Sequence, residues 1–357
     1  DGSILEVRRG IHEAAETIDA SGKMILPGMV NVGANLTAAK LLNGLLPDQH
    51  RLTWQGSLYY RLVVPMMAIA ADVLSEDEKY NMVRWAMQDA IASGSTAIAE
   101  MTFPDFEQAT LTAAEALGVC LWLVRQSATG GYPALDQEGK IIHLPGRRTD
   151  LEVLTPRSEL IRVLDGLHSV ESTSDELWQH ARQHAQSQPL MLNAAHNALE
   201  KQWSWQTHGK SPIALIHEHG ALTENTVLIN AFDTDFYDRE RIRTARAKVS
   251  LSALTAIHDA HEFPIVTLLK QDINASLGTG CYGVSMLEEM RAAAYAAKLQ
   301  TGLAHQFQAA DAFYAATVAG GKALNAPLGQ LEKGFAADML IVDPSTLGPI
   351  SYPVAHL

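Results

Sequence analysis

Residues 27–35 read PGMVNVGAN, a short apolar run that follows a Pro-Gly turn and ends at an asparagine. Apart from one asparagine, the run from Met29 to Val32 is apolar. Apolar runs of this length beside Gly and Pro are typical of strands that are covered on both faces, as in a parallel sheet. We therefore expect an interior strand here, and the rest of the chain indicates how many more follow it.

Similar strands recur along the chain with helical segments between them. Residues 75–78, Ser-Glu-Asp-Glu, form a capping box that begins an amphipathic helix, and Gly94 ends that helix. Further helices are expected at 109–117, 174–186 and 285–298. Further strands are expected at 96–99, 119–124, 161–164, 190–193, 227–230, 248–251 and 275–278.

About eight strand–helix units result, and eight is the number that closes a parallel barrel. The predicted fold class is α/β, a (β/α)8 TIM-like barrel. A doubly wound open sheet alternates in the same way and is the structural alternative. No G-x-G-x-x-G follows an early strand, so its dinucleotide-binding version has little support.

The two ends of the chain differ from this middle. Residues 4–7, 17–19 and 338–342 have the pattern of short strands without helices between them. We expect residues 1–26 and 326–357 to form a small β-sandwich domain, incomplete because a segment is missing upstream, and residues 27–325 to form the barrel. Residues 132–149, rich in Gly and Pro, are expected to form an irregular loop or insertion.

Composition excludes several classes of function. The formal net charge is −13, from 27 basic and 40 acidic residues, and no strong basic patch interrupts it, so nucleic acid is not an expected partner. No apolar run approaches the roughly 20 residues of a membrane span, and no secretory signal is visible. Two cysteines make no disulfide framework and fit a reducing cytoplasm, which is the expected location.

Four motifs resemble the amidohydrolase superfamily in order and spacing, most closely the s-triazine and atrazine chlorohydrolase-like enzymes and related aminohydrolases of the cytosine-deaminase type. Residues 18–31 resemble the Leu-Pro-Gly turn that leads into barrel strand 1. The other three motifs resemble the approach to strand 2, strand 8 with its following helix, and the return to the small domain. They are residues 92–98, residues 276–279 with 286–291, and residues 329–338.

The resemblance implies a zinc- or iron-type ion that turns water into hydroxide, held by histidines that end strands 1, 5 and 6 and an aspartate that ends strand 8. In this chain the five ligand positions hold other residues. They are Gly33, Asn35, Asn193, Asn230 and Gly280. Glycine has no donor side chain and an amide is a poor ligand, so we expect no metal and no other cofactor.

Other residues near the strand ends are candidates for chemistry. His196 takes the place of the family's proton-shuttling glutamate, and Asp233 that of a second histidine after strand 6. Cys281, just after strand 8, is a conceivable nucleophile beside a histidine and an aspartate. His168 resembles a histidine after strand 4 that contacts substrate. With Asn35, Asn193, Asn230 and Gly280 it makes the expected ligand pocket.

Three functions follow from these residues. The first is a metal-free pseudoenzyme, an inactive or non-metal-dependent homologue that binds a small polar ligand, and we expect it to be a homodimer. The second is a hydrolase or lyase that uses His196, Asp233 or Cys281 without a metal. The third is a hydrolase of non-peptide C–N bonds, deaminase- or chlorohydrolase-like, with a small heterocyclic or amide substrate.

Overall fold

Eight parallel strands dominate the fold in the computed structural model, which describes residues 2–10, 14–42, 59–136, 140–144, 158–194 and 198–347. Their order in the sheet is β11-β10-β9-β8-β7-β4-β3-β2. In chain order they are β2 (Met29–Ala34), β3 (Ser95–Thr102), β4 (Cys120–Ser127), β7 (Ile161–Leu167), β8 (Leu190–Ala194), β9 (Thr226–Asn230), β10 (Lys248–Leu251) and β11 (Ala275–Leu277).

The two outer strands of this sheet, β2 and β11, meet and nearly close it into a barrel. Ala34 and Gly280 form a parallel bridge. The Asn35 N–H donates to the Gly280 carbonyl at 2.9 Å, and the Gly280 N–H donates to the Gly33 carbonyl at 3.3 Å. The predicted TIM-like barrel is therefore confirmed, and the doubly wound open sheet is excluded. All eight predicted strands are present, with their ends shifted by a few residues.

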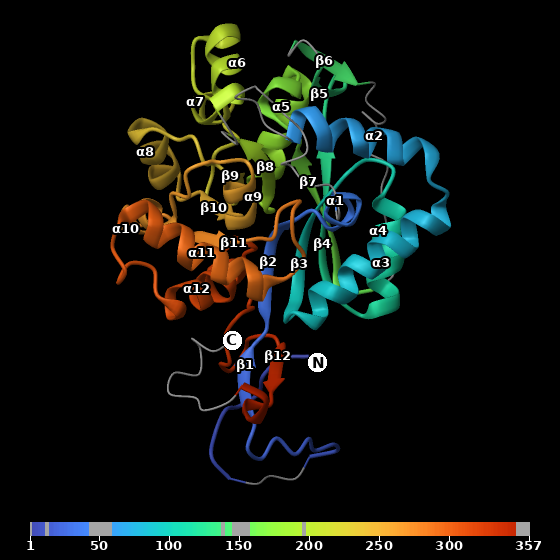
Figure 1. Ribbon diagram of the computed structural model, residues 1–357, viewed down its shortest axis with the longest axis vertical. Coiled ribbons are helices and arrows are strands. Elements are labelled where there is room, and N and C mark those ends of the chain that lie inside the picture. Colours follow the sequence, from blue (N-terminus) through green and yellow to red (C-terminus); the bar gives the residue numbers. More distant parts are fainter. Residues whose placement is uncertain are drawn as a thin grey trace.

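Helices surround the strands and bury their outer sides, as Figure 1 shows. They are α1 (Leu36–Leu42), the π-helix η2 (Tyr59–Val63), α2 (Val64–Val73), α3 (Glu76–Ala92), α4 (Glu107–Leu117), the 3-10 turn η3 (Val170–Ser172), α5 (Asp175–His184), α6 (Ala198–His208), α7 (Pro212–Glu218), α8 (Phe236–Ala245), α9 (Ala253–His258), α10 (Ile265–Lys270), α11 (Met286–Thr301), α12 (Ala309–Ala316) and α13 (Val318–Ala323). The 3-10 turn η4 (Pro344–Leu347) lies apart from them, near the carboxyl end of the chain. None of the helices in the described ranges is long and apolar enough to cross a bilayer.

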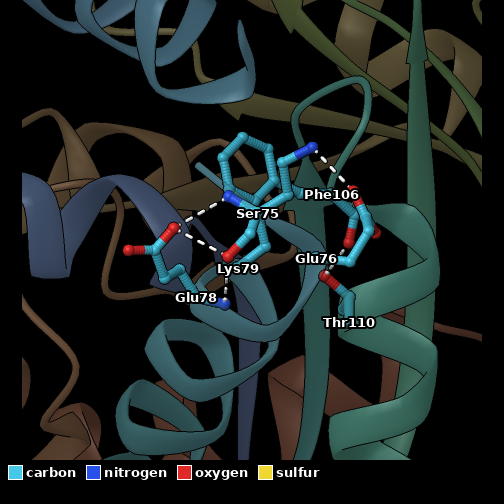
Figure 2. A network of polar contacts seen from close by, with 6 residues as sticks. All are labelled: Ser75, Glu76, Glu78, Lys79, Phe106 and Thr110. Carbon is cyan, nitrogen blue, oxygen red and sulfur yellow. Dashed lines mark hydrogen bonds and ion pairs between the residues drawn. The ribbon is translucent and has the colours of Figure 1, made fainter. Parts of the chain in front are cut away.

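The amino end of α3 illustrates how local sequence fixes these helices (Figure 2). Ser75 Oγ accepts from the Glu78 N–H at 3.4 Å, and Glu78 Oε2 accepts from the Ser75 N–H at 2.8 Å, which is the predicted capping box. The Lys79 ammonium lies 2.8 Å from Glu76 Oε1 and 5.5 Å from the ring centre of Phe106 at the start of α4. This cation therefore links the two neighbouring helices.

The two ends of the chain pair with each other outside the barrel. Strand β1 (Met24–Pro27) runs antiparallel to β12 (Met339–Val342), and Ser3 forms a bridge with Ala336. Figure 1 shows both strands below the barrel, side by side. The described residues contain this two-stranded sheet rather than the expected sandwich, and 17–19 form no strand. The domain limits 1–26, 326–357 and 27–325 stay a prediction.

The insertion expected to be irregular contains a hairpin. Strands β5 (Tyr132–Leu135) and β6 (Ile141–Leu144) pair antiparallel, with Tyr132 opposite Leu144. The Tyr132 hydroxyl donates to the carbonyl of Gln126 at 2.6 Å, which ties the hairpin to the carboxyl end of β4. Residues 137–139 and 145–149 of the insertion lie outside the described residues.

Closure of the barrel gives a direct test at Gly278. A Cβ on this residue would lie 1.8 Å from the carbonyl oxygen of Val32 in β2, so no side chain fits between the two backbones. We expect Gly278→Ala to lower the free energy of unfolding by about 3 kcal/mol or more, measured by urea denaturation.

The matched control is Gly302→Ala. Gly302 ends helix α11 with a φ of 66°, and a Cβ on it would meet open space. Only backbone strain of about 1 kcal/mol is expected there. Equal losses for the two variants would show that the close approach at Gly278 is not what limits stability.

Candidate functional site

The five positions expected to correspond to metal ligands lie at the carboxyl ends of four barrel strands. Gly33 and Asn35 are at the end of β2, and Gly280 bonds to both of them through backbone atoms. Asn193 and Asn230 end the neighbouring strands β8 and β9, where Ala194 is in register with Asn230. The strand-end arrangement inferred from sequence is therefore present at this mouth of the barrel.

Each of the three asparagine side chains is buried and has a hydrogen-bond partner. Asn193 Nδ2 donates to Gln126 Oε1 at 3.3 Å, Asn230 Oδ1 accepts from the Ser252 N–H at 3.2 Å, and Asn35 Oδ1 accepts from the Ala38 N–H at 3.3 Å. The Asn193 bond runs from β8 to β4, the Asn230 bond runs to the end of β10, and the Asn35 bond lies at the start of α1. They give the mouth a neutral polar lining.

The two glycine positions are tightly packed. A Cβ on Gly33, whose φ is 89°, would lie 3.0 Å from Ile229 Cδ1. A Cβ on Gly280, whose φ is 59°, would lie 2.3 Å from Thr255 Oγ1 and 2.9 Å from Ser252 Oγ. A carboxylate at Gly280 would require these hydroxyl groups to move.

Glycine and amide side chains at these five positions do not fit a zinc- or iron-type ion, which prefers imidazole, thiolate and carboxylate ligands. Within the described ranges, no group of three or more His, Cys, Asp and Glu residues is placed to hold a metal ion. We therefore assign no chemical step to a metal at these positions.

His168, just after the carboxyl end of β7, lies in a buried aromatic cluster. Its ring centre is 4.5 Å from that of Tyr132 and 5.8 Å from that of Tyr59, and its Nε2 is 3.2 Å from the Tyr59 hydroxyl. Nδ1 is buried without a hydrogen-bond partner in the described part of the chain. Burial lowers the pKa of His168 to about 3, so the ring is neutral near pH 7.

Two acids that sequence reasoning missed lie close to this cluster. Glu200 of α6 is buried and hydrogen-bonds the Tyr60 side chain. Glu171 in η3 lies 4.0 Å from His208 Nε2, and burial raises the pKa of Glu171 to about 7. Nothing in their sequence context distinguishes them from surface glutamates, because the tyrosine and the helices that bury them come from distant segments.

A second group of titratable residues lies beside the ends of β9 and β11. The Tyr282 hydroxyl donates to Asp259 Oδ1 at 2.8 Å, and His261 Nε2 lies 4.0 Å from Asp259 Oδ2. The His261 ring stacks on Phe232 with ring centres 5.4 Å apart. The Asp259 side chain is 1% exposed, and burial raises its pKa to about 6 although the bond from Tyr282 lowers it. Sequence reasoning missed Asp259 and His261 as well.

The three predicted catalytic candidates are placed differently. Cys281 is buried beside this second group, and burial with the nearby Asp259 charge raises the pKa of its thiol well above the ordinary value. A thiol held in this form is a poor nucleophile. Asp233 is 36% exposed and lies 3.4 Å from the Lys201 ammonium. His196 lies outside the described residues.

Two further buried carboxylates hold helix ends at the mouth. Glu100 accepts from the Leu36 N–H at the start of α1 at 3.0 Å. Glu289 accepts from the N–H groups of Ala253 and Leu254 at the start of α9. Burial raises the pKa of both to about 8, whereas the backbone donors lower it. We interpret both as helix caps that position the loops after β2 and β10.

A parallel eight-stranded barrel with polar groups at its carboxyl mouth defines a TIM barrel, a fold whose active sites lie at that mouth. Residues 24–356 match the amidohydrolase family. The chain belongs to this family, as the sequence motifs predicted.

Curated relatives in this family are named deaminases. The chain is 28% identical to the 5'-deoxyadenosine deaminase of Methanosarcina mazei over 353 residues, which cover 96% of this chain and 78% of the relative. It is 26% identical to the 5-methylthioadenosine/S-adenosylhomocysteine deaminase of Thermococcus kodakarensis over 368 residues, which cover 99% of this chain and 82% of the relative.

Solved structures support the fold. The atrazine chlorohydrolase of Arthrobacter aurescens, complexed with zinc, matches with a TM-score of 0.82 at 19% identity, over 99% of this chain and 84% of that one. The guanine deaminase of C. acetobutylicum, with bound guanine, matches with a TM-score of 0.78 at 18% identity, over 99% and 86%.

These comparisons correct our leading functional prediction. We predicted a metal-free pseudoenzyme, but relatives that span nearly the whole chain are named deaminases, so this prediction is wrong. It rested on residue types at five positions and overlooked other titratable groups at the mouth, such as Asp259. The alternative that we kept open, a hydrolase of non-peptide C–N bonds, agrees better with the relatives.

The buried neutral His168 gives a test of its environment by pH. Its folded-state pKa of about 3 lies below the ordinary 6.5, so the unfolded chain binds a proton that the folded chain does not. Stability therefore falls as pH falls through 6.5, and this loss amounts to about 2 kcal/mol at pH 5. We expect His168→Phe to remove this part of the pH dependence in urea unfolding measured from pH 7.5 to pH 5.

The comparison uses the change with pH within each variant, so the lost Tyr59 contact does not affect it. Exposed His217 in α7 is the control, and His217→Phe should leave the pH dependence as in the parent. A His168→Phe protein that loses stability on acidification as steeply as the parent would contradict a buried neutral ring.

Proposed function

We propose that this protein hydrolyses a C–N bond in a small aminated heterocycle, with its site at the carboxyl mouth of the barrel. The observation that carries the proposal is the match of 96% or more of the chain to relatives named deaminases. The substrates in their names, 5'-deoxyadenosine, 5-methylthioadenosine and S-adenosylhomocysteine, share an adenine ring with one exocyclic amino group. We take amino-substituted purines as the first substrate class.

The proposed reaction replaces the amino group by oxygen. A water oxygen adds to the ring carbon that bears the amino group, one water proton passes to a base, and the C–N bond breaks. The nitrogen leaves as ammonia after gaining a proton, and the ring keeps a carbonyl group and an N–H. The protein must therefore supply one group that accepts and returns a proton and others that hold the ring.

Asp259 is the residue that we assign to the proton transfer. Its pKa of about 6 lets the carboxylate accept a proton near neutral pH and return it. Tyr282 holds one carboxylate oxygen at 2.8 Å, and His261 lies 4.0 Å from the other. Tyr282 follows β11, and His261 stacks on the residue Phe232 that follows β9, so this group adjoins the strand ends.

His168 and the strand-end amides are the residues that we assign to ring binding. A neutral imidazole with an unpartnered buried Nδ1 suits a hydrogen bond to a heterocycle nitrogen or amino group. Asn35, Asn193 and Asn230 offer further amide donors and acceptors. Asp233 and His196 remain predicted candidates for proton transfer. The buried neutral thiol of Cys281 does not favour it as a nucleophile.

We also propose that Gly33, Asn35, Asn193, Asn230 and Gly280 occupy the positions at which this family keeps its metal ligands. The support is their place at the ends of β2, β8, β9 and β11, together with the four motifs that resemble the family in sequence.

Activity is tested with the full chain and a panel of aminated purine nucleosides, by ammonia release and by the change of the ultraviolet spectrum. We expect turnover on at least one of them, with kcat falling below about pH 6 because the Asp259 carboxylate must be ionised to accept a proton. Asp259→Asn should reduce kcat about 100-fold or more.

Glu218→Gln is the matched control, since it removes one exposed carboxylate that pairs with Lys210 and has no role in the proposed chemistry, and it should leave kcat unchanged. Turnover that persists in Asp259→Asn would refute the assigned residue but not the function. Absence of ammonia release from the whole panel, with the protein recovered folded and intact, would refute the function.

The ligand positions are tested by restoring imidazole. We expect the triple variant Asn35→His, Asn193→His and Asn230→His to bind zinc at least about 100-fold more tightly than the parent, because imidazole is a far better zinc ligand than an amide. Competition with a chromogenic chelator measures this affinity. The control places three histidines on exposed helix positions, as Asn81→His, Gln108→His and Gln202→His. Equal zinc affinity in the two triple variants would contradict the assignment.

A further inference from the structure

A cavity of about 720 Å³ lies at the opposite end of the barrel from the proposed site. Its walls come from the turns that precede β9 and β10, from α13 and from the segment that leads back to the terminal sheet. The polar lining residues are Glu224, Asn225, Arg246, Lys248, Lys322, Asn325 and Gln330. None of these residues takes part in the chemistry proposed above.

The lining carries positive charge in a strongly acidic chain. Three cations, Arg246, Lys248 and Lys322, face the cavity with one carboxylate, Glu224, although the whole chain has a net charge of −13. The Arg246 guanidinium is exposed and forms no ion pair within the described residues. Arginine presents a planar set of donors that matches the oxygens of phosphate and carboxylate groups.

The base of the cavity is held by a chain of hydrogen bonds. Lys248 Nζ donates to Asn325 Oδ1 at 2.7 Å and to the backbone carbonyl of Glu224. Asn325 Nδ2 donates to Asn225 Oδ1 at 2.8 Å. Lys322 Nζ donates to the Tyr314 hydroxyl at 2.7 Å. Two of the cations are therefore fixed in place before any ligand arrives, which reduces the entropy lost on binding.

The remaining wall is apolar. Beside the cations, the cavity is lined by Val318, Pro327, Leu328 and Phe335. A bare inorganic ion would leave this wall without a partner, whereas an anion with an apolar body would cover it. Burial lowers the pKa of Lys248, whereas the nearby charge of Glu224 raises it.

We propose that this cavity is a second binding site, for a small organic anion with a phosphate or carboxylate group and an apolar body. Arg246 and Lys322 hold the anionic group at the rim and Lys248 holds it from the base. The apolar body lies against Leu328 and Phe335. The site is separate from the catalytic mouth and does not depend on the function proposed there.

Calorimetric titration of the full chain with phenyl phosphate tests the proposal, with benzoate as the carboxylate probe and phenol as the uncharged probe. We expect one phenyl phosphate or one benzoate per chain with a Kd below about 1 mM, and no binding of phenol in the same range. The tighter of the two anions identifies the anionic group that the site prefers.

Arg246→Gln and Lys322→Gln should each weaken binding of the tighter anion about tenfold. Arg243→Gln is the matched control. Arg243 lies in the last turn of α8, three residues before Arg246, which caps that helix, and it pairs with Glu240 outside the cavity. This control should bind as the parent does. Absence of binding by both anions, equal binding of phenol, or an equal loss in Arg243→Gln would overturn the proposal.

Discussion

The contact between β2 and β11 is the constraint on which the barrel depends, because a parallel sheet of eight strands has two free edges until these strands meet. The contact is short, with a parallel bridge between Ala34 and Gly280 and two backbone hydrogen bonds beside it. Gly278 lets the backbones approach within a distance that no side chain permits. Closure also brings the ends of β2, β8, β9 and β11 to one mouth, so the same glycines that allow the fold determine the shape of the candidate site.

The mouth combines neutral amides with titratable side chains. The amides of Asn35, Asn193 and Asn230 are each hydrogen-bonded within the fold, whereas Asp259 and His168 come from segments that follow the strands. Burial raises the pKa of Asp259 and lowers the pKa of His168. Glu100 and Glu289 are equally buried but bond to helix amino ends, so they support the loops. Burial alone therefore does not distinguish a chemical role from a structural one.

Sequence patterns predicted the barrel well because each strand is a local apolar run beside a turn, as in Lys248–Leu251. They placed the strand-end residues at one mouth because the topology of a parallel barrel leaves no other arrangement. They missed Asp259 because its raised pKa comes from burial in the folded chain, which its own sequence neighbours do not reveal. They also treated 132–149 as irregular, although cross-strand pairing orders part of it. Contacts between distant segments carry no local signal.

The pairing of the two chain ends has a consequence for biosynthesis. Strand β1 pairs with β12, which lies more than 300 residues later in the chain. The bridge between Ser3 and Ala336 also joins residues more than 300 positions apart. The barrel likewise cannot close until β11 has been synthesised and can contact β2. During translation, β1 and β2 therefore leave the ribosome first, and their partners β12 and β11 are synthesised near the end. Nascent chains hold an exposed strand edge during most of translation, a state in which chaperone contact protects against aggregation.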